Sequence, residues 1–194
     1  AAPASVAPVA SQAPVATTPS TGPYGVLDSQ SLKPGGATRS TNAGLNAIGN
    51  EVYDVALGQA FKPTRSGNLQ TLAFMIGAAS GNLSLTVYEA DRGGFPDATK
   101  LKGQLTLPSS EVQGFNDFTY FRFANPIALE AAKTYVAVVT CPGAAASVAL
   151  SDKPGSAGKL SLSFASNGGE HLSWDTTPSN EGFEYLAHRV YQAP

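Results

Sequence analysis

The chain has 194 residues, a length that suits one domain of ordinary size rather than two. Charged residues make up 13% of it and the formal net charge is -2, so no basic surface is expected and the sequence predicts no nucleic-acid partner. Its 20 glycines and 14 prolines, beside 42% hydrophobic residues, favour many short strands joined by turns over long helices.

The first part of the chain has the composition of an extended arm. Residues 1–27 contain no charged residue, and residues 7–11 and 13–17 form a near-repeat, Ala-Pro-Val-Ala-Ser and Ala-Pro-Val-Ala-Thr. A proline fixes its own φ, lacks an N–H donor and biases the preceding residue toward extended backbone. At about 3.1 Å per residue the first 23 residues would reach about 70 Å, which exceeds the roughly 40 Å width of a body of the remaining size.

We therefore expect an extended N-terminal arm over residues 1–36, followed by a domain over residues 37–194. The hypothesis for this arm is that it docks on neighbouring subunits, and that its prolines lower the entropy lost on docking. The alternative is a linker or stalk. The candidate assembly residues are Pro3, Pro8, Pro14, Pro19 and Pro23.

From about residue 50 onward, apolar residues alternate with polar or small ones in short runs. The clearest are residues 71–76, 83–88 and 160–164, where the period of two indicates half-buried strands. Further strands are expected at residues 53–61, 100–107, 117–123, 134–140, 147–150 and 183–191. Turn residues such as Gly93-Gly94 and Asn125-Pro126 separate the runs. Helix is limited to a turn at residues 109–112 and another near residues 42–48.

This succession predicts an all-β protein, an antiparallel jelly-roll-like β-sandwich of about eight or nine strands. The motifs within residues 53–140 also carry a resemblance; they are Gly-Gln-Ala-Phe-Lys-Pro at 58–63, Leu-Ser-Leu-Thr-Val-Tyr-Glu-Ala-Asp at 83–91, Gly-Phe-Pro at 94–96 and Phe-Arg-Phe-Ala-Asn-Pro-Ile-Ala-Leu at 121–129. This part of the chain resembles a recurrent bacterial β-sandwich of secreted carbohydrate-associated and surface proteins, and is similar to modules on phage particles. The resemblance implies a jelly-roll-like fold and usually no catalysis.

No catalytic residue is predicted. Both histidines lack a partner for nucleophilic catalysis, because the chain has no Gly-x-Ser-x-Gly motif. Alternation places His188 on the strand face of Leu186 and Val190, which favours a buried histidine over a general base. The single cysteine, Cys141, excludes a disulfide within the chain and a cysteine-based zinc site, and we expect it to be a small apolar residue.

No cofactor is predicted, and the acidic residues offer only a weak metal site. Glu89, Asp91 and Asp97 surround the Gly93-Gly94 turn and are the calcium candidates. Their spacing is not that of a regular calcium loop, so a solvated hairpin tip is the alternative.

Aromatic residues are the candidates for ligand binding, since a flat ring presents a dry surface to the C–H face of a sugar. A possible glycan site is formed by Trp174, His171, Asp175 and Tyr185. The alternative is that Trp174 closes one end of the core. Simple alternation directs Tyr88 and Tyr120 away from the apolar faces of their strands, either to cover the sheet or to meet a neighbouring subunit.

Two functional hypotheses follow. The first is a non-catalytic structural or attachment protein of a multi-subunit assembly, such as a virion decoration or cement protein or a surface appendage component, with neighbouring subunits as partners. The second is a carbohydrate-binding module or lectin-like domain of a secreted bacterial protein, with a glycan as partner. Both place the chain on a virion or at an extracellular or cell surface. No apolar stretch approaches the roughly 20 residues of a membrane span.

Overall fold

The structure is a computed structural model that describes residues 21–31, 34–43, 53–142, 144–151, 160–165, 171–176 and 185–194. The predicted assembly residues Pro3, Pro8, Pro14 and Pro19 lie outside these ranges, whereas Pro23 is exposed in the first turn. Within the described ranges no helix is both long and apolar enough to cross a membrane.

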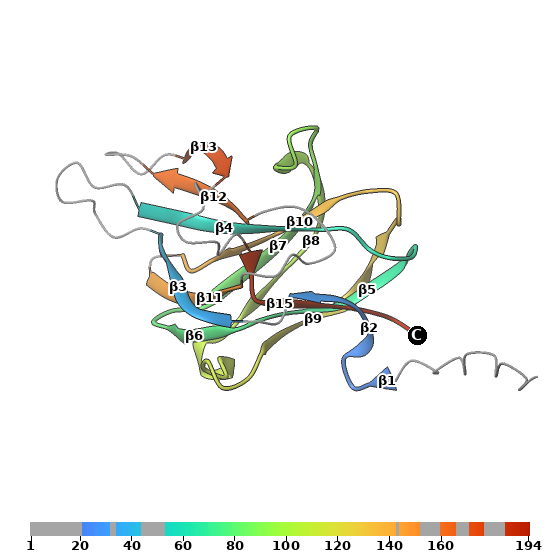
Figure 1. Cartoon of the computed structure of the whole chain (residues 1–194), viewed down its shortest axis with the longest axis horizontal. Coiled ribbons are helices and arrows are strands. Elements are labelled where there is room, and N and C mark those ends of the chain that lie inside the picture. Colours follow the sequence, from blue (N-terminus) through green and yellow to red (C-terminus); the bar gives the residue numbers. More distant parts are fainter. Residues whose placement is uncertain are drawn as a thin grey trace, which may run out of the picture.

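The described strands form three antiparallel sheets (Figure 1). The five-stranded sheet has, in spatial order, β1 (Thr21–Gly22), β2 (Gly25–Ser31), β15 (His188–Gln192), β5 (Gly67–Phe74) and β9 (Thr119–Leu129). The six-stranded sheet has β13 (His171–Thr176), β12 (Leu160–Ala165), β4 (Tyr53–Phe61), β10 (Tyr135–Thr140), β7 (Leu83–Ala90) and β8 (Pro96–Leu107). A smaller sheet has β14 (Tyr185–Leu186), β11 (Ala144–Ser151) and β3 (Pro34–Ala43), and β6 (Ile76–Ala79) also pairs with β11.

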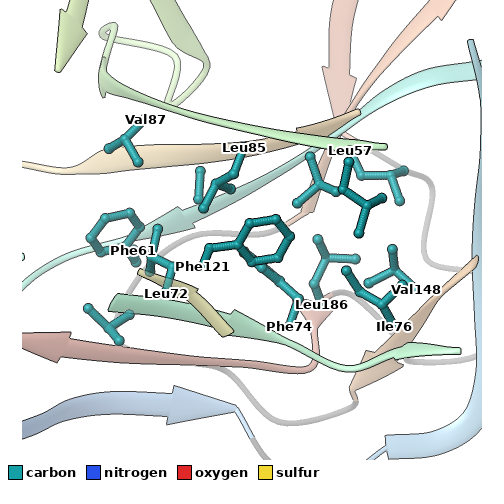
Figure 2. Packing of buried hydrophobic residues seen from close by; sticks show 14 of the residues in the cluster. Leu57, Phe61, Leu72, Phe74, Ile76, Leu85, Val87, Phe121, Val148 and Leu186 are labelled. Carbon is teal, nitrogen blue, oxygen red and sulfur yellow. The ribbon is translucent and has the colours of Figure 1, made fainter. Parts of the chain in front are cut away.

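One large core lies between the five-stranded and six-stranded sheets. Figure 2 shows Phe61 of β4, Leu85 of β7 and Phe121 of β9 converging on it, and the rings of Phe74 and Phe121 meet edge to face at 6.1 Å. Alternate residues of β7, namely Leu83, Leu85 and Val87, enter this core, as the period of two predicts. The prediction of an all-β, sandwich-like, antiparallel protein is therefore confirmed at this level.

The described residues hold fifteen strands, more than the eight or nine predicted. The expected strand over residues 71–76 is interrupted at Met75, where the chain passes from the five-stranded sheet to the small sheet. There the Met75 N–H donates to Ala187 O at 3.1 Å, and Met75 O accepts from Ala149 N–H at 2.8 Å. The predicted turn at Asn125-Pro126 instead lies inside β9.

Strands also occupy part of the segment assigned to the arm. Gly25–Ser31 pairs along β15, and Pro34–Ala43 pairs along β11. Residues 25–31 and 34–36 thus belong to the sheets. The expected helical turn at residues 109–112 is a 3-10 helix over Ser109–Glu111. Asn42 and Ala43 end β3 rather than begin a helix, because they pair with β11.

Candidate functional site

The strands β8 and β9 form an open side of the sandwich. Each is the last strand of its sheet, and in the part of the chain that the structure describes neither has a strand partner on its outer side. Residues 101–105 of β8 and 122–128 of β9 line a groove of about 580 Å³ between the two edges. At its floor Ile127 packs on Gly103, since a Cβ added to Gly103 would lie 2.5 Å from Ile127 Cδ1.

The two edges differ in how well they could accept another strand. In β9, pairing with β5 is interrupted, because Leu69 is opposite Ile127 whereas Thr71 is opposite Arg122. This bulge contains Pro126, which has no N–H, and bulges and prolines are two devices that block edge pairing. The β9 edge is therefore protected.

In β8 the protection covers only the first half. Lys100 and Lys102 carry charge there, and both reach back to Glu89 of the neighbouring strand β7, at 3.5 and 3.4 Å. The following residues, 103–107, are Gly-Gln-Leu-Thr-Leu and contain neither charge nor proline. This uncharged edge, residues 103–107, is a short strand edge that is free to pair with an extended segment.

A second candidate is a group of tyrosines on the outer face of the five-stranded sheet. Residues directly opposite in antiparallel strands share a face. Leu72, Val190 and Phe121 lie opposite one another in β5, β15 and β9, and all three enter the core. Because side chains alternate along a strand, the rows of opposite residues on either side of these three face outward. These rows are Leu27–Tyr191–Thr71–Arg122 and Gln30–Arg189–Ala73–Tyr120. The register thus brings Tyr120 and Tyr191 to one face.

Tyr24 joins them from the turn between β1 and β2. Its ring stacks on Tyr120 at 3.9 Å with an interplanar angle of 7°, and lies 6.2 Å from Tyr191. Gly25 allows this approach, because its φ is +107° and an added Cβ would lie 2.5 Å from Gln192 O. We call Tyr24, Tyr120 and Tyr191 the tyrosine cluster.

The tyrosine cluster lies beside the cation of Arg189 and beside two buried polar atoms that lack a hydrogen-bond partner in the described structure. The Arg189 guanidinium lies 4.3 Å from the Phe118 ring centre, and its Nη1 donates to Tyr120 Oη at 3.5 Å. Burial raises the pKa of Tyr120, and the nearby Tyr191 and Asp117 add to that rise. Thr71 Oγ1 and Arg189 Nε are buried without a hydrogen-bond partner in the described structure. Both atoms lie beneath the outer surface of this sheet face, out of reach of a bound ligand.

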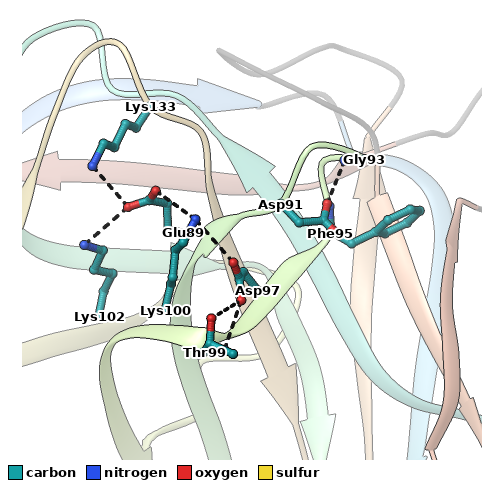
Figure 3. Close-up of polar contacts among 9 residues, drawn as sticks. All are labelled: Glu89, Asp91, Gly93, Phe95, Asp97, Thr99, Lys100, Lys102 and Lys133. Atoms are coloured by element: carbon teal, nitrogen blue, oxygen red, sulfur yellow. Dashed lines mark hydrogen bonds and ion pairs between the residues drawn. The ribbon is translucent and has the colours of Figure 1, made fainter.

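The calcium candidates do not share a site (Figure 3). Glu89 pairs with Lys100, Lys102 and Lys133, whereas Asp97 accepts from the Thr99 N–H at 3.0 Å and pairs with Lys100 at 3.3 Å. Asp91 Oδ1 accepts the N–H groups of Gly93 and Phe95, at 2.8 and 2.9 Å, and so shapes the turn. Among the described residues no group of three or more acidic, histidine or cysteine side chains could hold a metal ion.

The electrostatics of these carboxylates agree with that geometry. Desolvation raises the pKa of Glu89, but Lys133, Lys102 and Lys100 outweigh it and hold the pKa below its ordinary value. The hydroxyl and N–H of Thr99 lower the pKa of Asp97, with Lys100 adding to the effect. The acidic loop is thus neutralised by lysines and backbone donors.

Neither the buried histidine nor the cysteine is placed for catalysis. His188 is 1% exposed, and its Nδ1 lies 2.8 Å from Leu186 O on its own segment. Burial lowers the pKa of His188 to about 4, so the ring is neutral at pH 7. Cys141 is buried in the core, its Sγ lies 3.6 Å from Gly81 O, and burial raises the pKa of its thiol. As expected, Cys141 is a small core residue.

The predicted glycan residues lie on two sheets. In β13, Trp174 is opposite Ser163, Asp175 is opposite Leu162 and His171 is opposite Ala165, all on the edge of the six-stranded sheet. Their side chains lie outside what the structure describes. Tyr185 is half-buried and pairs with Ser151 in the small sheet.

The sequence predicts only part of the tyrosine cluster, since it indicates Tyr120 but not Tyr24 or Tyr191.

No protein-family model, curated protein or solved structure matches this chain.

Proposed function

We propose that the protein is a non-catalytic structural or attachment component of a multi-subunit assembly, on a virion or at an extracellular or cell surface. The observation that carries the proposal is the uncharged edge of β8, beside a groove of about 580 Å³. A free strand edge binds extended segments through main-chain hydrogen bonds, and an adjacent groove accepts their alternate side chains. We also propose that the sandwich of this protein has a jelly-roll-like topology.

The chain also carries a segment suited to such an edge. Residues 1–20 contain no charge and only small, aliphatic or uncharged polar side chains. The groove is lined by Phe123 and Ile127 and also by the cations Lys102 and Arg122. An uncharged segment brings no ion of its own to be desolvated when it enters such a groove. Docking of this arm on neighbouring subunits would hold the assembly together.

Sedimentation velocity of the full chain and of a variant lacking residues 1–20 tests the proposal. This deletion leaves β1 and β2 intact, so the sheets should stay folded. We expect the full chain to form oligomers in a concentration-dependent manner and the shortened chain to be monomeric, with equal far-UV circular dichroism. Equal association of the two proteins would contradict the proposal.

A second candidate function, carbohydrate binding, is favoured by the tyrosine cluster. Three tyrosine rings and the Arg189 guanidinium, whose Nη1 donates to Tyr120 Oη, lie on one sheet face. Rings stack on sugar C–H faces, and the polar atoms would bind sugar hydroxyls.

A glycan array followed by titration of any bound sugar tests this candidate. We expect Tyr120→Ala to weaken binding at least about fivefold, since a well-packed ring contributes about a kilocalorie per mole or more. Tyr88→Ala is the matched control, because Tyr88 packs on the six-stranded sheet. Trp174→Ala tests the site expected from the sequence. Binding that survives Tyr120→Ala but is lost in Trp174→Ala would place the sugar on β13 instead.

A further inference from the structure

We propose that each half of the near-repeat, residues 7–11 and residues 13–17, docks as an added antiparallel or parallel strand on the uncharged edge of β8 in a second copy of the chain. This inference rests on the proposed assembly function and names the parts that would carry it. The observations behind it are the spacing of the prolines, the length of the uncharged edge and the protection of the β9 edge.

The proline spacing leaves one side of an extended arm able to pair. In a strand, the N–H and C=O groups of successive residues point to opposite edges. Pro8 and Pro14 are six residues apart, so in an extended arm both would face the same edge. The odd-numbered residues 7, 9, 11, 13, 15 and 17 are not proline and keep their N–H donors at the other edge.

The spacing of six residues also places the larger apolar side chains of the arm on one face of an extended strand. Side chains also alternate between the two faces of a strand, so Val9 and Val15 would share one face. On an added strand beside β8, one face continues the core side of the six-stranded sheet, where Leu105 packs against the core. We assign the valine face to this side, over the groove.

The dimensions favour β8 as the acceptor. Each half of the near-repeat has the same length as the uncharged edge, residues 103–107. The β9 edge is interrupted by its bulge and Pro126, and the earlier part of β8 carries Lys100 and Lys102. The uncharged edge is long enough for one half of the near-repeat, whereas each chain has two halves. At least one half is therefore available to bind another copy.

Paired proline variants of the full chain test the register directly. Ala7→Pro with Ala13→Pro removes donors from the pairing edge, whereas Ala10→Pro with Ala16→Pro adds the same two prolines at the edge that Pro8 and Pro14 already occupy. In sedimentation velocity we expect the first pair to weaken self-association at least about fivefold, the value of one lost hydrogen bond. The second pair should associate as the unmodified chain does.

A charge on the acceptor gives an independent measurement. Gln104→Lys places a lysine in the uncharged edge and should also weaken association, whereas Gln30→Lys, an exposed glutamine of β2, should not. Equal effects of the two proline pairs, or an unchanged association in Gln104→Lys, would overturn the inference. If deletion of residues 1–20 still abolishes oligomers in that case, the assembly function stands and only the register and acceptor are wrong. A full chain that is monomeric at all concentrations would overturn both.

Discussion

At the scale of single residues, His188 shows how the core sets chemistry. The ring is fully buried beside Phe74, and its Nε2 has no hydrogen-bond partner in the described structure. Burial therefore favours the neutral form, and the pKa falls to about 4 from 6.5. A neutral, buried imidazole contributes shape and one contact to Leu186 O rather than proton transfer.

This predicts a pH dependence of stability. The pKa of His188 is lower in the folded chain than in the unfolded chain, so the unfolded chain binds a proton at higher pH. The free energy of unfolding that is present above pH 6.5 is therefore lost as the pH falls to about 4. The full loss is about 3 kcal/mol for a shift of this size. Urea unfolding of His188→Leu should show a flatter profile over this range than the unmodified chain, with His171→Asn as the control. Parallel profiles for His188→Leu and the unmodified chain would contradict the assignment.

At the scale of elements, the first hairpin is held by one residue with a special conformation. Gly25, the first residue of β2, has a positive φ and no room for a side chain, since an added Cβ would lie 2.5 Å from Gln192 O. Any side chain there would force the β1–β2 turn, and with it Tyr24, away from Tyr120.

Gly25→Ala should therefore disrupt the tyrosine cluster. We expect a loss of about 1–3 kcal/mol in urea unfolding and a weaker tyrosine signal in near-UV circular dichroism. Gly94→Ala is the control, because its φ is +86° but no atom lies within 4 Å of an added Cβ. A near-UV spectrum that changes as much in Gly94→Ala as in Gly25→Ala would show that contact with Gln192 does not position Tyr24.

Local patterns predicted most strands of the described body. The alternation of residues 83–88 corresponds to β7, since a strand with one buried face must alternate. The run at residues 53–61 corresponds to β4, whose residues 56–61 are buried on both faces. β2 and β3 were missed because their glycine, serine and threonine residues show no alternation and followed a proline-rich segment. Asn125-Pro126 was predicted as a turn, but β9 absorbs these residues in a bulge, which only its pairing with β5 reveals.

The candidate sites could be predicted less well, because they depend on which strands become neighbours. Nothing in residues 96–107 alone shows that β8 ends its sheet, and the groove exists only because β9 ends the other. Likewise, Tyr24 and Tyr120 are far apart in the sequence and meet through the order of the five strands. The acidic residues near Gly93 are found by composition, but composition does not show that Glu89 pairs with Lys102 of β8 and with Lys133 of the loop between β9 and β10.

At the scale of the whole molecule, an uncharged N-terminal segment is joined to a sandwich in which, among the described strands, the edge of β8 has no partner. The large core gives the body stability of its own, since it draws on strands of all three sheets. Association then needs only a few main-chain hydrogen bonds per subunit, which repetition around an assembly would multiply.

Hydrogen–deuterium exchange of the full chain at low and high protein concentration tests this claim most directly. We expect the outward N–H groups of residues 103–107 to exchange more slowly as the protein concentration rises, while those of the interior strand β10 do not change. Loss of this protection in Ala7→Pro with Ala13→Pro would identify the arm as the occupant. Exchange at residues 103–107 that is independent of concentration, in a chain that sediments as an oligomer, would contradict the account.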